Sequence, residues 1–246
     1  MPADGVKLKN KNVTCRKERL AKKIPCGGCF DRKGLCAACP LIVADDGRIG
    51  KRADAIMSEQ KRVLRRRMLD LRESLPPEEA RRESLAVCER LVRHPAFREG
   101  ETILFYFPFR KEVDVRPAME EAWSSGKRVV LPKADPGTKS LSFFSIRRGE
   151  PLVAGAYGIP EPSGKASAKI PPGAIDLVVV PGVAFDGRGY RLGYGGGYYD
   201  RFFSRHSGPF RRIGVAYSFQ VVPTVFPEAH DQPLDGLITP SRTFSF

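Results

Sequence analysis

The fold is indicated most clearly by residues 176–205, which read "DLVVVPGVAFDGRGYRLGYGGGYYDRFFSR". An apolar run ends near Val180, a loop follows, and four glycines stand within five positions just before an expected helix. A continuous run of valine and leucine is typical of a strand that is buried on both faces. The stretch therefore predicts a buried strand, a glycine-rich turn and a helix that begins near Gly197.

The same alternation of strands and helices extends over most of the chain. Apolar, β-branched segments predict strands at 102–107, 128–132, 141–146, 176–185, 211–217 and 235–240. Amphipathic segments predict helices at 59–71, from Pro76 to the residues before His94, at 116–127 and at 198–205. Strands that alternate with helices favour an α/β fold. We predict a three-layer, Rossmann-like arrangement, in which helices flank a mainly parallel open sheet.

A short, basic, cysteine-rich extension at 1–57 is expected to precede the main domain at 58–246. The extension contains "CGGCFDRKGLCAAC", in which two CxxC pairs are separated by six residues. Two such pairs can hold one zinc ion in a tetrahedral thiolate site. An iron–sulfur cluster and a segment of free thiols are the alternatives. The predicted zinc ligands are Cys26, Cys29, Cys36 and Cys39.

The boundary between the two parts is expected near Met57. Residues 40–57 read as a linker, and Met57 is a natural start for a shorter protein. Ser58 is a candidate N-cap for the first helix, because its hydroxyl can accept a hydrogen bond from a free backbone N–H. The apolar residues expected on one face of that helix are Val63, Leu64, Met68 and Leu71.

The chain carries a formal net charge of +14, which is spread over its length. Lysine and arginine neutralise phosphates, but no zinc finger of the two-cysteine, two-histidine kind, basic zipper or aromatic RNA-binding motif is visible. We therefore favour a basic surface in a protein that binds small anions over a nucleic-acid partner. The longest apolar run, "IDLVVVPGVAF", is too short to span a bilayer, and no signal-peptide pattern is visible. We expect a cytoplasmic monomer without a membrane partner.

The glycine stretch is physically suited to a nucleoside triphosphate. A helix N-terminus presents unpaired N–H groups and partial positive charge, and glycines allow the backbone to approach an anion closely. Arg191 and Arg201 could add charge, and Asp200 could hold Mg²⁺ beside the phosphates. The pattern is neither a G-x-x-x-x-G-K-[ST] loop nor a G-x-G-x-x-G fingerprint. A purely structural glycine turn therefore remains open on these residues alone.

Several segments together resemble one known family. "RLGYGGGYYDRFF" at 191–203, with "PGVAFD" before it, resembles the signature of the 5-formyltetrahydrofolate cyclo-ligase family. The segments "KRVLRRRM", "FPFRKEVDV", "YGIPEP" and "HDQPLDGLITP" are similar to other parts of that family and follow in the same order. The resemblance covers roughly residues 58–243 and leaves the cysteine segment outside. It implies ATP-driven conversion of 5-formyltetrahydrofolate to 5,10-methenyltetrahydrofolate, with release of ADP and phosphate.

The resemblance also implies roles for individual residues, including three catalytic ones, Arg191, Tyr198 and Asp200. The residues implied to contact ATP are Lys61, Arg65, Arg191, Gly193, Tyr194, Gly195, Gly196, Gly197, Tyr198 and Tyr199. Those implied to contact the folate are Phe107, Glu112, Tyr157 and Tyr198, and those implied to bind Mg²⁺ are Asp200 and Asp235. Two positions depart from the pattern: Tyr194 stands where one form of the motif has arginine, and Gly196 replaces a lysine found in some members.

Two other functions remain open at this point. The first is a protein of the same fold whose substrate has changed. The second is a metal-dependent nucleic-acid-binding or regulatory protein that uses the four cysteines and the basic charge. The second alternative predicts association with DNA or RNA that weakens steeply with salt.

Overall fold

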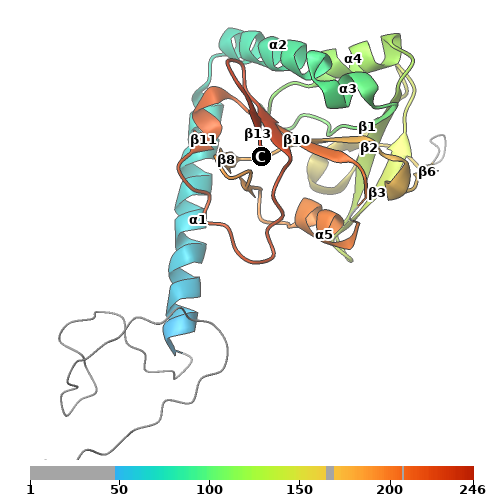
Figure 1. The fold of residues 1–246 in the computed structure, drawn as a ribbon. Coiled ribbons are helices and arrows are strands. Elements are labelled where there is room, and N and C mark those ends of the chain that lie inside the picture. The colour runs from blue at the N-terminus through green and yellow to red at the C-terminus, as the bar shows by residue number, and fades with distance from the viewer. Residues whose placement is uncertain (1–47, 165–168, 207) are drawn as a thin grey trace, which may run out of the picture. The chain divides into compact units, whose positions relative to one another are not determined.

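The structure is a computed structural model that describes residues 48–164, 169–206 and 208–246. The predicted zinc ligands Cys26, Cys29, Cys36 and Cys39 therefore lie outside the described residues. Residues 50–246 form one compact unit around a large sheet (Figure 1).

The central sheet has eight strands in the order β13-β12-β10-β7-β1-β2-β3-β6. Its five middle strands run parallel: β12 (Gly236–Ile238), β10 (Arg211–Val215), β7 (Leu177–Val180), β1 (Thr102–Leu104) and β2 (Arg128–Asp135). The edge strands pair antiparallel: β13 (Thr243–Ser245), β3 (Ser140–Ser145) and β6 (Lys169–Ile170). The prediction of a mainly parallel α/β sheet is confirmed.

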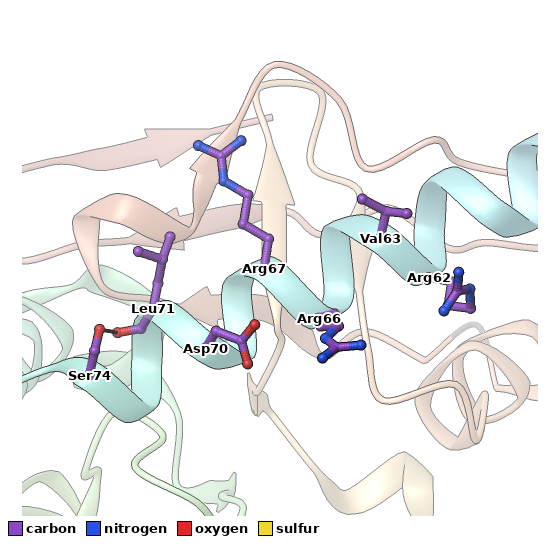
Figure 2. Close-up of a pocket in the computed structure, with 7 residues that line it drawn as sticks. All are labelled: Arg62, Val63, Arg66, Arg67, Asp70, Leu71 and Ser74. Atoms are coloured by element: carbon purple, nitrogen blue, oxygen red, sulfur yellow. Dashed lines mark hydrogen bonds between the residues drawn. The ribbon is translucent and has the colours of Figure 1, made fainter.

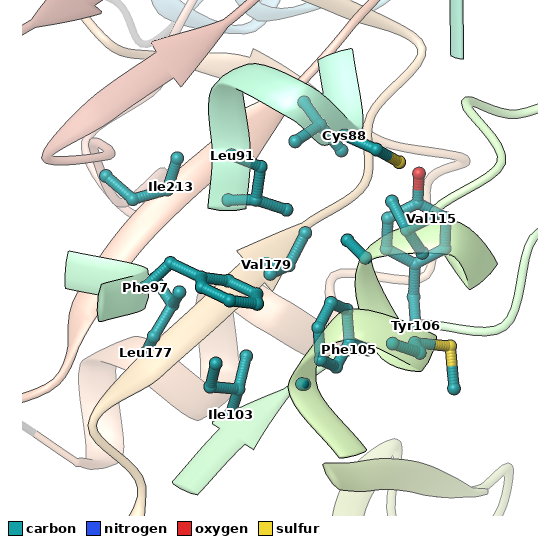
Figure 3. Close-up of a cluster of buried hydrophobic side chains, with 14 of the residues drawn as sticks. Cys88, Leu91, Phe97, Ile103, Phe105, Tyr106, Val115, Leu177, Val179 and Ile213 are labelled. Atoms are coloured by element: carbon teal, nitrogen blue, oxygen red, sulfur yellow. The ribbon is translucent and has the colours of Figure 1, made fainter. Parts of the chain in front are cut away.

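Helices cover both faces of this sheet, because side chains along each strand point alternately to opposite sides. Leu177 and Val179 of β7 belong to the core under α2 (Pro77–Arg93), α3 (Pro95–Glu99) and α4 (Arg116–Ser124), as Figure 3 shows for part of that cluster. Val178 and Val180 belong to the opposite core, under α5 (Tyr198–Arg205). All four β7 side chains are fully buried. The continuous apolar run therefore reflects burial on both faces, and the three layers follow (Figure 1).

The first helix, α1 (Arg48–Ser74), is longer than its sequence predicts. Its start at Arg48 makes residues 48–57 helical, so the linker assigned there is wrong and Ser58 is not an N-cap. The expected apolar face is also partly wrong, because Val63 is 55% exposed and Leu71 is 41% exposed. Although α1 has 27 residues, no helix in the described part of the chain is long and apolar enough to cross a membrane.

The inward face of α1 instead combines apolar and cationic residues. Leu64 and Met68 pack against a small core, and Arg72 on the same face is almost completely buried. Lys61 and Arg65 are half-buried on this face, whereas Arg66 and Arg67 are exposed. Positions 61, 65, 68 and 72 follow the i, i+4, i+7, i+11 spacing of one helix face.

The expected strand at 176–185 is divided into two strands, β7 and β8 (Ala184–Asp186), which belong to different sheets. Pro181 and Gly182 stand at the break, and a Cβ on Gly182 would lie only 2.5 Å from the Phe185 ring. β8 pairs with β9 (Arg191–Leu192) and β11 (Val221–Val222) in a three-stranded sheet. The glycine loop therefore leaves this small sheet rather than the central one. The remaining elements are β4 (Val153–Ala154), β5 (Pro160–Glu161), η1 (Ala156–Gly158), η2 (Pro172–Ala174) and η3 (Ser218–Gln220).

Candidate active site

The glycine loop at 193–197 connects β9 to α5 and lies against α1. The Nε of Arg65 donates a 2.8 Å hydrogen bond to the carbonyl oxygen of Gly193. Burial lowers the pKa of Arg65, but a guanidinium remains charged at neutral pH. The structure therefore brings together the basic first helix and the glycine loop, two segments that the sequence separates by 128 positions.

Two of the loop glycines have backbone conformations that favour glycine. Gly195 has a φ of +102° and Gly197 a φ of +64°, where an L side chain is strained. Gly197 is the N-cap of α5, and no side chain caps this helix. A Cβ on Gly193 would meet nothing within 4 Å, so packing alone does not require glycine there. The loop combines backbone conformations that glycine adopts easily with uncapped N–H groups and with open space at Gly193, which suits an anion.

Arg191 and Asp200 form a largely buried ion pair beside this loop. The Nη2 of Arg191 lies 3.1 Å from Oδ1 of Asp200, and the N–H of Gln232 donates to the same oxygen at 3.2 Å. The guanidinium also lies 5.4 Å from the ring centroid of Phe203. Burial lowers the pKa of Arg191, and Asp200 beside it opposes that shift. Asp200 is thus held firmly in the first turn of α5, and both of these bonds fall on one oxygen.

The second predicted magnesium ligand, Asp235, lies in a different setting. It immediately precedes β12, at the edge where the parallel strands begin. Arg212 of β10 donates from Nε and Nη2 to the two carboxylate oxygens, at 3.1 and 3.0 Å, and its backbone N–H donates at 2.7 Å. Both oxygens of this predicted metal ligand are therefore engaged by a guanidinium.

Lys61 is held by two carboxylates rather than by the glycine loop. Its Nζ lies 2.9 Å from Asp231 and 3.0 Å from Glu228. Burial alone would lower the pKa of Lys61, but the two carboxylates raise it above its ordinary value. Asp231 is followed by Gln232, whose N–H binds Asp200, so this ion cluster borders the Arg191–Asp200 pair. His230, beside this cluster, is mostly exposed.

Glu112 is buried in the loop that follows β1, and a residue missed by sequence reasoning lies beside it. The N–H of Phe109 donates to Oε2 of Glu112 at 3.0 Å, and Nη1 of Arg72 lies 3.9 Å from Oε1. Arg72 also donates from Nη2 to the hydroxyl of Tyr194. Burial raises the pKa of Glu112 to about 7, although Arg72, the Phe109 N–H and Tyr194 oppose that rise. A signal for Arg72 was present, since it lies eleven positions after Lys61 on one helix face.

Known proteins share this arrangement of segments. The sequence profile of the 5-formyltetrahydrofolate cyclo-ligase family matches residues 57–240. The chain belongs to this family.

Individual relatives agree with the family match. The 5-formyltetrahydrofolate cyclo-ligase of Escherichia coli K12 is 31% identical over 177 residues, which cover 71% of this chain and 97% of the relative. The solution structure of the Aquifex aeolicus 5,10-methenyltetrahydrofolate synthetase is 38% identical, has a TM-score of 0.67, and is matched over 75% of this chain and 92% of that one. The Mycoplasma pneumoniae synthetase structure is 27% identical with a TM-score of 0.61, over 73% and 98% of the two chains.

Two tyrosines of this cyclo-ligase family member form an aromatic corner beside the glycine loop. Tyr157 is 64% exposed and has a φ of +63°, an uncommon conformation for a bulky residue. Its hydroxyl lies 2.9 Å from that of Tyr198, and the two rings meet edge to face with centroids 6.3 Å apart. Phe107, the third aromatic residue predicted for the folate, is partly buried against the core under α2 and α4. Strain at an exposed aromatic residue is typical of a binding site.

A large surface hollow lies elsewhere, on the outward face of α1 (Figure 2). Its volume is about 670 Å³, and it is lined by Arg62, Val63, Arg66, Arg67, Asp70, Leu71 and Ser74. These residues occupy the side of the helix opposite Lys61, Arg65 and Arg72, and none of them was predicted for the site. The two α1 residues that the resemblance implies for ATP, Lys61 and Arg65, therefore lie on the face of the helix opposite this hollow.

Proposed function

We propose that this protein is an ATP-dependent cyclo-ligase that converts 5-formyltetrahydrofolate to 5,10-methenyltetrahydrofolate, releasing ADP and phosphate. The observation that carries the proposal is the family match over 57–240, together with the contact of Arg65 with the glycine loop. A turn that served only to connect β9 to α5 would not need a cationic side chain bonded to it.

The glycine loop is proposed to bind the ATP phosphates. The N-terminus of α5 offers uncapped N–H groups, and Arg65 and Arg191 add positive charge on two sides of the loop. A Cβ on Gly196 would lie 2.8 Å from the Tyr198 ring, so a side chain there would displace that ring. Because glycine replaces a lysine here, we propose that arginines supply more of the charge that faces the phosphates in this chain.

The reaction requires positioning and charge neutralisation rather than a protein nucleophile. The formyl oxygen attacks the terminal phosphorus of ATP, the bond to ADP breaks, and the formyl carbon becomes an activated imidate-like centre. The neighbouring anilino nitrogen then attacks this carbon and loses its proton. The carbon–oxygen bond breaks, phosphate leaves, and the five-membered ring is closed. Cationic groups around the loop stabilise the charge that the transferred phosphoryl group carries.

The folate is proposed to lie between Glu112 and the aromatic corner of Tyr157 and Tyr198. A carboxylate accepts two hydrogen bonds at once, and the pterin ring offers adjacent amino and ring N–H donors. The exposed ring of Tyr157 and the ring of Tyr198 offer apolar surface for the flat parts of the substrate. Phe107, which follows β1 in the same loop as Glu112, extends this surface.

Magnesium is implied by the use of ATP, and the residues present fit it in part. Hard oxygen ligands suit Mg²⁺, and both bonds to Asp200 fall on Oδ1, so Oδ2 would hold the ion. The ion would neutralise phosphate charge. Asp235 fits less well, because Arg212 engages both of its oxygens. We therefore propose Asp200 as the principal protein ligand.

One assay tests the activity directly. The purified chain is mixed with Mg-ATP and 5-formyltetrahydrofolate, and the near-ultraviolet absorbance of the methenyl product is followed alongside ADP release. We expect both signals to rise at the same rate, with no rise when either substrate is left out. ADP release without methenyl product would indicate a changed substrate. A folded protein that releases no ADP but binds DNA or RNA in a salt-dependent way would favour the nucleic-acid alternative.

A further inference from the structure

Arg72 is a buried cation that links three separate parts of the site. Its side chain is 1% exposed, although arginine is rarely buried without a full set of partners. It projects from the last turns of α1, contacts Glu112 in the loop after β1, and contacts Tyr194 in the glycine loop. No other residue described by the structure is recorded in contact with both of these side chains.

Only one nitrogen of the Arg72 guanidinium has a hydrogen-bond partner among the described residues. Nη2 donates to the Tyr194 hydroxyl, and the guanidinium carbon lies 5.5 Å from the centroid of the Tyr194 ring. Nε and Nη1 have no hydrogen-bond partner among the described residues. Nη1 is 3.9 Å from the Glu112 carboxylate, which is close enough for charge attraction but too long for a hydrogen bond. Buried donors of this kind cost folding free energy, which is typical of a group retained for function.

Arg72 favours the ionised form of the Glu112 carboxyl, because the other groups around this carboxyl carry no charge. Arg72 is the one cation at ion-pair distance from Glu112 in the part of the chain that the structure describes. The other groups around Glu112 are neutral: the Phe109 N–H, the Tyr194 hydroxyl, Tyr106 in the loop after β1 and Tyr199 of α5. A further tyrosine, Tyr217, donates to the main-chain oxygen of Glu112 at 3.2 Å. Without a cation, a carboxylate buried among neutral groups holds its proton near neutral pH.

We propose that Arg72 is a positioning residue for the folate half of the reaction, which keeps Glu112 ionised and oriented so that both of its oxygens accept hydrogen bonds from the pterin. If Glu112 were protonated, one of its oxygens would carry a hydrogen and would face a hydrogen-bond donor of the pterin instead of accepting from it. This inference rests on the proposed function, because it concerns the residue proposed to hold the pterin.

Tyr194 completes the arrangement from the side of the glycine loop. Its hydroxyl accepts a hydrogen bond from Arg72 and helps to lower the pKa of Glu112, and the Arg72 guanidinium lies over its ring. A tyrosine here therefore fixes both partners without bringing a second positive charge to the pair. Tyr194→Phe keeps the ring and removes the hydroxyl, so it separates anchoring by the hydroxyl from the charge of Arg72.

The test compares Arg72→Met with Arg72→Lys, and uses Arg66→Met on the solvent face of α1 as a matched control. kcat/KM for 5-formyltetrahydrofolate is measured at saturating Mg-ATP from pH 5.5 to 9, by ADP release. For the unaltered protein we expect kcat/KM to fall below about pH 7, as Glu112 gains its proton. Arg72→Met should move this limb up by about one pH unit and raise the folate KM about fivefold at pH 7, with little change in the ATP KM.

Three further results are expected. The folate KM of Arg72→Met should fall back at pH 9, where Glu112 ionises without help. Arg72→Lys should keep the limb near its original position because the charge remains. Glu112→Gln should remove the limb altogether. An Arg72→Met protein that weakens ATP and folate equally, with an unmoved limb, would overturn the proposal.

A titration of Glu112 that does not depend on turnover separates the proposed role of Arg72 from the proposed enzymatic activity. Glutamate labelled with ¹³C at the side-chain carboxyl is incorporated, Glu112 is assigned by its absence in Glu112→Gln, and its titration is followed in the unaltered protein, Arg72→Lys and Arg72→Met. We expect a midpoint near pH 7 that moves up only in Arg72→Met. If Arg72→Met does not fold, a Glu112 midpoint well above that range in Arg72→Lys or the unaltered protein would also overturn the proposal. A protein that shows the expected titration but forms no methenyl product would disprove the proposed function alone.

Discussion

Two arginine–aspartate ion pairs have similar distances, but they differ in whether the aspartate keeps a carboxylate oxygen without a hydrogen bond from the pair. Arg191–Asp200 and Arg212–Asp235 have closest contacts of 3.1 and 3.0 Å. In the first pair the Arg191 side chain is 4% exposed and the Asp200 side chain 21%, whereas both side chains of the second pair are 25% exposed. The bonds to Asp200 fall on one oxygen, and those to Asp235 occupy both.

The difference shows how an aspartate can be placed to bind a metal ion at one position and to hold two strands together at another. Asp200 lies in the first turn of α5, next to uncapped N–H groups, where a cation and phosphates are expected. Asp235 ties the start of β12 to β10 through one side chain and one backbone bond. The family resemblance assigns both aspartates to magnesium, but their geometry favours only the first.

The largest effect is expected from Asp200→Ala. Loss of the carboxylate removes the proposed magnesium ligand and leaves the buried Arg191 guanidinium without its partner. We expect kcat to fall by about 100-fold and the magnesium concentration for half-maximal rate to rise. Turnover is measured across a magnesium titration, and circular dichroism serves as the control for folding. Unchanged magnesium dependence in a folded variant would break the distinction drawn between the two pairs.

A smaller effect is expected from Arg191→Met, which keeps the length and apolar stem of the side chain. Asp200 would retain the Gln232 N–H but lose a charge-assisted bond, so its carboxylate would be less firmly placed. We expect kcat/KM for ATP to fall about tenfold, less than in Asp200→Ala. Arg191→Lys, which preserves the charge, should recover part of this loss. If Arg191→Met were more damaging than Asp200→Ala, the arginine rather than the aspartate would be the principal group.

The second pair predicts a change in stability rather than in chemistry. Asp235→Asn keeps one acceptor oxygen but loses the two-pronged ion pair with Arg212. We expect the free energy of unfolding to fall by about 1–3 kcal/mol, while the magnesium dependence of turnover stays as in the unaltered protein. Chemical denaturation and a magnesium titration on the same sample check both parts. An unchanged stability together with a raised magnesium requirement would instead support Asp235 as a magnesium ligand.

Much of the fold was predictable because a strand that is buried on both faces appears in the sequence as a continuous apolar run. The runs at 128–132 and 211–217 are strands for the same reason as Leu177–Val180. The start of α1 was not predictable, since "GRIGKRADAIM" contains glycines and no clear cap. The break between β7 and β8 depends on how Gly182 meets the Phe185 ring, which is a contact in three dimensions.

The residues proposed for the site could be named from the sequence, but their partners could not. The family resemblance implied Arg65 and Glu112, and the glycine stretch together with the resemblance indicated Asp200, yet nothing in the sequence pairs Asp235 with Arg212. Arg72 was missed because it lies outside the basic segment at 61–68 that carries the resemblance, although its spacing from Lys61 places it on the same helix face. Its burial follows from the period of α1 and from the loop after β1, where Arg110 and Lys111 adopt positive φ values of 46° and 53°. Such a loop conformation, which sets the position of Glu112, depends on tertiary contacts.

The smallest effect is expected from deleting residues 1–46. Both ion pairs, the glycine loop and all of α1 lie beyond this point, and the family match begins at residue 57. We expect kcat and its magnesium dependence to change by less than about twofold, since no proposed ligand is removed. A deeper deletion of residues 1–61 provides the contrast, because it removes Lys61, which binds Asp231 next to Gln232, a partner of Asp200. This deeper deletion should therefore raise the magnesium requirement. An equal loss from both deletions would mean that the extension itself supports the Arg191–Asp200 pair.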